Sequence, residues 1–78
     1  MRNIDALTFA EMVEGPFTSR DVAEFYDDPN QPGASACLRR LFVHDHLART
    51  LVDNHTYAYI LTARGKRRLS YMRTMGQE

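Results

Sequence analysis

Most of the basic side chains of this 78-residue chain lie in its second half, with types and spacing suited to binding phosphate groups. Arg39 and Arg40 follow Ser35 and Ala36 in a segment with helical spacing. Farther along the chain lie Arg49, Arg64, Lys66, Arg67 and Arg68. Arginine can bond bidentately to guanine, and both arginine and lysine bind phosphates. These residues therefore predict contacts to a nucleic acid.

The formal net charge is zero, but the charge is divided unevenly along the chain. Residues 1–32 carry seven acidic and two basic side chains, which is about −5. Residues 33–78 carry eight basic and three acidic side chains, which is about +5. A basic surface on one side of a small domain is typical of a protein that binds the phosphate backbone. A domain that is neutralised internally, or that associates with itself, is the alternative explanation.

Other reactive side chains form no strong motif. Because Cys37 is the single cysteine, the chain cannot form an internal disulfide, which fits a reducing cytoplasm. Cys37 lies on an apolar helix face, so a packing role is favoured over redox sensing. His44, His46 and His55 are possible zinc ligands, but the first two should point in different directions. The chain also lacks a glycine-rich phosphate loop and paired catalytic carboxylates. We expect no metal, no cofactor and no enzymatic activity.

Three helices are predicted ahead of the β-prone segment. Apolar spacing indicates helices at 3–14, capped by Asn3 and ended by Gly15, and at 19–27, capped by Thr18. Residues 28–33 hold several helix breakers and predict a loop before a third helix at 34–46. If its apolar face packs on the core, the residues on its outer side are Ser35, Ala36, Arg39, Arg40 and Val43.

The remainder of the chain predicts a hairpin and a last helix. β-prone runs at 47–52 and 56–61 flank turn residues 53–55 and predict a hairpin. Tyr57 and Tyr59 should pack the sheet against the helices, and stacking on unpaired bases is the alternative. Thr62 then caps a helix at 63–75, which Gly65 weakens slightly. The prediction is one mainly α domain, 1–78, with a small β-hairpin.

This order of elements resembles the winged helix-turn-helix regulators of the MarR, ArsR and PadR type, particularly small archaeal or viral forms. TSRDVAEFY at 18–26 is similar to the first helix of the helix-turn-helix, and ASACLRRLFVHDHLART at 34–50 to a recognition helix running into a strand. YAYILTARGKRRL at 57–69 is similar to the closing strand and helix. The resemblance implies a three-helix bundle, a two-stranded wing and a C-terminal helix. Where such families have a glycine after the recognition helix, this chain has Asp45-His46-Leu47.

The resemblance implies a cytoplasmic transcription regulator that binds double-stranded DNA sequence-specifically, with helix 34–46 in the major groove. The expected DNA contacts are Ser35, Ala36, Arg39, Arg40, Arg49, Arg64, Lys66, Arg67 and Arg68. We also expect a homodimer through the first and last helices, because apolar side chains exceed the needs of a thin core: Phe9, Met12, Val13, Leu69, Met72 and Met75. No membrane association is expected.

Two alternatives stay open. A winged-helix domain can bind other proteins instead of DNA, since a fold alone does not fix a function. Arg39 and Arg40 can also form a solvated helix face, paired with acids of the second helix such as Glu24 or Asp28.

Overall fold

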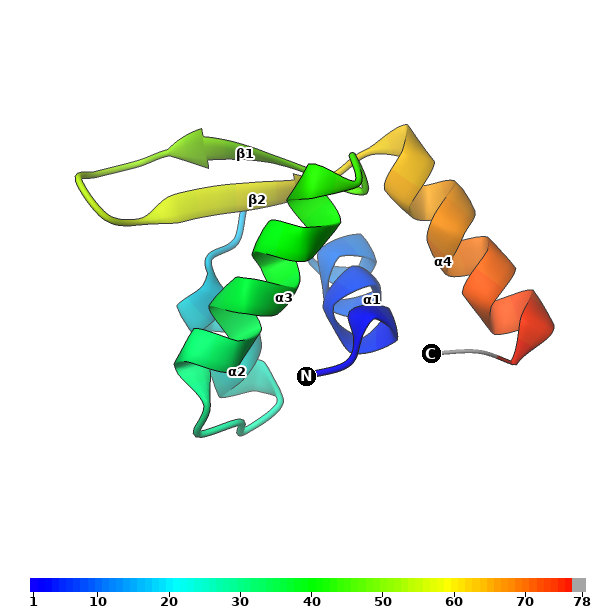
Figure 1. Cartoon of the computed structure of the whole chain (residues 1–78), viewed down its shortest axis with the longest axis horizontal. Coiled ribbons are helices and arrows are strands. Elements are labelled where there is room, and N and C mark those ends of the chain that lie inside the picture. The colour runs from blue at the N-terminus through cyan, green and yellow to red at the C-terminus, as the bar shows by residue number, and fades with distance from the viewer. Residues whose placement is uncertain (77–78) are drawn as a thin grey trace.

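Four helices and one two-stranded sheet make up residues 1–76, the part of the chain described by this computed structural model (Figure 1). The helices are α1 (Asn3–Val13), α2 (Ser19–Phe25), α3 (Gln31–Val43) and α4 (Ala63–Met75), and the strands are β1 (Leu47–Leu51) and β2 (Tyr57–Leu61). α1 lies among α2, α3 and α4, and the hairpin extends sideways from the end of α3 (Figure 1). The predicted mainly α fold with one β-hairpin is confirmed. None of these helices is long and apolar enough to cross a bilayer.

The hydrophobic core draws on every element. Its largest fully buried side chains are Leu7, Phe17, Val22, Leu38, Leu41, Leu47, Leu69 and Met72. Phe17, in the α1–α2 connection, also exchanges two backbone hydrogen bonds with Tyr59 of β2, with N–O distances of 3.0 and 2.7 Å. This bridge fixes the hairpin to the helices. Of the six apolar side chains expected to be in surplus, Phe9, Leu69 and Met72 are buried in this core, because α4 packs against α1.

The first two helices differ from the predictions mainly at their ends. Arg2, not Asn3, is the N-cap of α1, and Asn3 instead accepts a hydrogen bond from the Cys37 Sγ at 3.4 Å. α1 ends with Glu14 in the left-handed region (φ 56°), one residue before the expected glycine. The Thr18 cap of α2 is confirmed, since Thr18 and Asp21 exchange the two bonds of a capping box.

α3 begins three residues earlier than predicted. The Asn30 carboxamide oxygen accepts from the Gly33 N–H at 3.1 Å and caps the helix. Pro32 then lies in the first turn, where a helix needs no N–H donor. Three of the residues predicted as a loop (31–33) therefore open the helix.

α3 also ends earlier than predicted, at Val43. His46 N donates to the Leu41 carbonyl (2.8 Å) and Asp45 N donates to the Phe42 carbonyl (3.0 Å), which is the Schellman arrangement. Asp45 has φ 63°, so an aspartate occupies the left-handed position that glycine usually fills. The helix therefore turns sharply into β1, and 44–46 are not helical.

The hairpin and α4 follow the predicted order. β1 and β2 are antiparallel with Leu47 opposite Leu61 and Arg49 opposite Tyr59. Thr62 caps α4 by accepting from the Gly65 N–H at 2.9 Å. Gly65 itself is buried, and a Cβ there would collide with the His46 carbonyl oxygen and the Leu61 side chain. Its absent side chain therefore lets α4 approach the α3–β1 corner, which the sequence did not indicate.

Candidate nucleic-acid interface

A groove of about 630 Å³ lies between the start of α2, one edge of α3 and the hairpin. Its polar and charged lining includes Arg20, Gln31, Ser35, Arg39, Arg49 and His55, and none of its lining residues is acidic. We call it the α3–hairpin groove.

The α3 side of this groove is a row of three polar side chains. Gln31, Ser35 and Arg39 are spaced by four residues, which places them along one face of the helix. Ser35 is half-buried, Gln31 and Arg39 are exposed, and the intervening apolar residues Ala34 and Leu38 point into the core. The row therefore presents an amide, a hydroxyl and a guanidinium group to solvent.

The hairpin side is built around Arg49. Its guanidinium carbon lies 4.1 Å from the centre of the Phe42 ring and 4.0 Å from the centre of the Tyr57 ring. Stacking on a ring leaves the N–H groups in the guanidinium plane free to donate to an anion or a base edge. Tyr59 is buried as predicted, whereas Tyr57 is partly exposed and contacts Arg49.

Arg39 is not neutralised by the acids of α2. Within residues 1–76, no carboxylate oxygen lies within 4.0 Å of the Arg39 or Arg40 guanidinium nitrogens. Glu24 pairs instead with Arg20 at 3.0 Å, and Asp28 with the N-terminal amine at 4.0 Å. The pairing offered as the alternative for Arg39 and Arg40 does not occur.

The two consecutive arginines of α3 share a shallow hollow with Ala36 and Val43, but each also lines a groove that the other does not. Successive residues of a helix are about 100° apart around its axis, so Arg40 lies on the other edge of the exposed face, beyond Ala36. There it lines a different groove, with His44, His46 and Arg68. Of the α3 residues predicted to contact DNA, the α3–hairpin groove therefore brings Ser35 and Arg39 together with Arg49 of β1.

The cations of α4 point to several surfaces away from this groove. Arg64 pairs with Asp45 at 3.8 Å, Lys66 lines a hollow beside Glu11 and Glu14, and Arg68 lies over the Tyr71 ring at 5.3 Å. Arg67 is exposed and is not among the residues lining these hollows. Contact with DNA by these four residues stays a prediction.

Gln31, Arg20 and His55 line the groove but were not among the predicted contacts. Gln31 lies four residues before Ser35, but the neighbouring prolines and glycine hid the start of the helix. Arg20 and His55 come from α2 and the hairpin tip, and only tertiary packing brings them to α3. The four-residue spacing of Gln31, Ser35 and Arg39 was the one local feature that pointed to part of the set.

The histidines near the end of α3 form no metal centre. No three His, Cys, Asp or Glu side chains of the described residues converge in a way that could hold a metal ion. The His44 and His46 rings are stacked, with centres 6.1 Å apart, and the buried Nδ1 of His46 has no hydrogen-bond partner. Burial, together with the positive charges of Arg68, His44 and Arg64, lowers the pKa of His46.

Three arginines line the α3–hairpin groove. Arg20 pairs with Glu24, whereas Arg39 and Arg49 have no ion-pair partner among residues 1–76, a composition that attracts phosphate. Comparison with known proteins found no matching family model, no matching curated protein and no matching solved structure. Functional inference for this chain therefore rests on its own residues.

Proposed function

We propose that this protein is a winged-helix transcription regulator that binds double-stranded DNA through the α3–hairpin groove. The observation that carries the proposal is the meeting of Arg39 and Arg49, from α3 and β1, in one groove that contains no acidic side chain. In this proposal α3 is the recognition helix and the β1–β2 hairpin is the wing.

The row on α3 would read base edges. A helix of 13 residues is about 20 Å long and fits the major groove of B-DNA, which is about 12 Å wide. Arginine bonds bidentately to guanine, glutamine to adenine, and serine to either. Gln31, Ser35 and Arg39 therefore supply suitable groups for three positions along the groove.

Arg49 would bind a phosphate beside the base contacts. Its position between Phe42 and Tyr57 restricts the side chain before DNA arrives, so less conformational entropy is lost on binding. Contacts of this kind fix the orientation of a protein on the duplex and make its affinity depend on salt.

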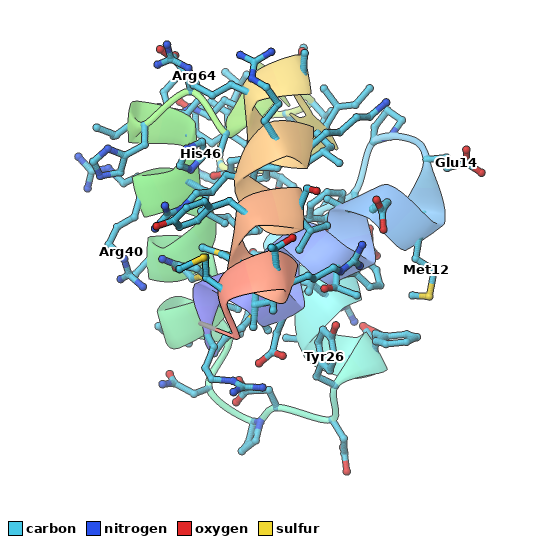
Figure 2. The ribbon with its side chains drawn as sticks, turned by 90° about the vertical axis from the view of Figure 1, so that its right-hand side faces the viewer. Met12, Glu14, Tyr26, Arg40, His46 and Arg64 are labelled. Atoms are coloured by element: carbon cyan, nitrogen blue, oxygen red, sulfur yellow. The ribbon has the colours of Figure 1, made fainter. Side chains whose placement is uncertain are left out.

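A homodimer on a two-fold DNA site is the second part of the proposal. Met12 and Met75, at the ends of α1 and α4, remain 52% and 54% exposed, and Val13 is also exposed. Figure 2 shows Met12 pointing outward at the end of α1, away from α4. A second copy covering these side chains would remove apolar surface from water.

The test begins with selection of a preferred duplex from a random pool, followed by fluorescence anisotropy at low and moderate salt. Arg39→Gln should weaken binding about five- to 150-fold, because a bidentate base contact contributes about 1–3 kcal/mol. Arg67→Gln removes the same charge outside the groove, so it should weaken binding to the selected and to random duplexes by a similar, small factor. Equal effects of the two substitutions on the selected duplex, or no binding at low salt, would refute the proposal.

Binding to another protein is the second candidate function. The observation that favours it is that Val52 and Ile60 of the hairpin are both about half exposed. Exposed apolar patches often mark protein interfaces. Intact DNA binding by a Val52→Ser, Ile60→Ser variant would argue that these two side chains serve such a partner or none.

A further inference from the structure

A second groove, of about 340 Å³, lies between α3 and α4, on the edge of α3 away from the α3–hairpin groove. Its lining includes Arg40 of α3, His44 and His46 of the α3–β1 corner, Arg68 of α4, and Asn3 of α1. In Figure 2, His46 lies between the two helices, and Arg40 extends from the side of α3 that is away from α4. No acidic residue is among its lining residues.

The positive charge of this groove is poorly compensated. The charged or titratable groups that act on His46 are Arg68, His44, Arg64 and Asp45. Of these, only Asp45 is acidic, and it pairs with Arg64 at 3.8 Å outside the groove lining. Neither Arg40 nor Arg68 has a carboxylate within 4.0 Å in residues 1–76. Two arginines therefore line one hollow without an ion-pair partner among residues 1–76.

We propose that the α3–α4 groove binds a small phosphate-bearing anion, held by Arg40 from one wall and Arg68 from the other. Guanidinium groups match the geometry of phosphoryl oxygens and donate paired, charge-assisted hydrogen bonds to them. His44, His46 and the Asn3 amide supply further polar groups around the anion. The groove volume is at the lower end of the range for small-molecule sites, about 300–1,000 Å³, which suits a phosphate monoester.

Anion binding in this groove has a consequence for His46. Without an anion, burial and the neighbouring positive charges hold the pKa of His46 below its ordinary value. A bound anion would offset the charges of Arg68, Arg64 and His44. The pKa of His46 should then rise, and the protein should take up protons on binding.

The test is an NMR titration of the whole chain with inorganic phosphate, made at constant ionic strength by replacing sodium chloride. Phosphate should shift the amide signals of residues 40, 44, 46 and 68 saturably, and should raise the pKa of His46 followed through its ring protons. Arg68→Gln and Arg40→Gln should each weaken phosphate binding at least about fivefold, because each removes a charge-assisted contact. Arg67→Gln, the matched control on α4, should leave phosphate binding unchanged.

Three results would overturn the proposal. Shifts that do not saturate, or that respond equally to Arg67→Gln and Arg68→Gln, would show general screening of charge. A response of His46 to duplex DNA but not to phosphate would assign the groove to the DNA backbone. Unchanged phosphate affinity in both Arg40→Gln and Arg68→Gln would place the anion elsewhere. The titration needs no DNA affinity, so it can succeed or fail independently of the DNA-binding proposal.

Discussion

The guanidinium carbon of Arg49 lies 4.0 Å from the centre of the Tyr57 ring, across the hairpin from β1 to β2. Arg49 is directly opposite Tyr59, so Tyr57 is its diagonal neighbour on the same face of the sheet. Phe42 closes the other side of the guanidinium at 4.1 Å. The register of the hairpin and the end of α3 therefore determine together where this positive charge is presented.

Tyr57→Leu should weaken DNA binding about two- to fivefold, because an exposed cation–π contact contributes about 0.5–1 kcal/mol. Fluorescence anisotropy with the selected duplex measures the change. Tyr71→Leu is the matched control, since Tyr71 lies under Arg68 on α4, away from the α3–hairpin groove. When Arg49 is already replaced by Gln, Tyr57→Leu should change DNA affinity little. An equally large loss of affinity in that background would show that Tyr57 does not act through Arg49.

Gly65→Ala should destabilise the protein by about 1–3 kcal/mol, because the new Cβ meets a backbone carbonyl that cannot easily move. This loss should exceed the gain of about 1 kcal/mol that alanine brings to a helix. Gly15→Ala is the control, since a Cβ there would lie 3.9 Å from the Val13 carbonyl oxygen, an ordinary van der Waals contact. Urea denaturation of the two variants gives the comparison, and equal stabilities would argue against close packing at Gly65.

Thr62→Ala should lower the free energy of unfolding by about 1–2 kcal/mol. The Thr62 hydroxyl accepts from the Gly65 N–H and also donates to the Asp45 carbonyl at 2.6 Å, so it joins α4 to the α3–β1 corner. For a domain of this size the Tm should fall by about 5–15 °C in thermal denaturation. Thr62→Ser should recover most of the loss, whereas Thr74→Ala, at an exposed position of α4, should have little effect.

The stability should fall with decreasing pH below about 6.5 because of His46. Its pKa is lowered in the folded protein, so the unfolded chain binds the proton first as the pH falls. The loss should begin near the ordinary pKa and level off below the lowered one. Denaturation at several pH values should show a weaker dependence for His46→Gln, while His55→Gln, at the exposed hairpin tip, should keep the dependence of the parent. An identical slope in His46→Gln would show that other groups cause it.

The oligomeric state should depend on the exposed methionines at the ends of α1 and α4. Light scattering at about 100 μM should give the mass of a dimer, and Met12→Glu with Met75→Glu should give a monomer because burying unpaired charges is unfavourable. Val52→Glu, on the exposed hairpin, is the control and should stay dimeric. A monomeric parent at this concentration would contradict the dimer.

Local chemistry was sufficient to predict several features. The Thr18 and Thr62 caps, both strands and α4 follow from side chains that act within a few residues, and all five were confirmed. The ends of α3 were not predicted correctly. Asn30 and Pro32 work as a helix start only because the chain continues into Ala34 and Cys37, which the core buries. Asp45 takes the left-handed position at which glycine usually ends a helix. The general preference of aspartate for turns does not show that the helix ends at this residue.

The sequence by itself determined the order of elements and the division of charge, because hydrophobic spacing and capping residues act locally. It placed Arg39 and Arg40 together on the outside of one helix. Only the tertiary structure decided that Arg39 lines the α3–hairpin groove with Arg49, while Arg40 lines the α3–α4 groove with Arg68. The physical reason is that two adjacent helix residues diverge by about 100°, so the elements packed on either side of α3 determine what each one meets.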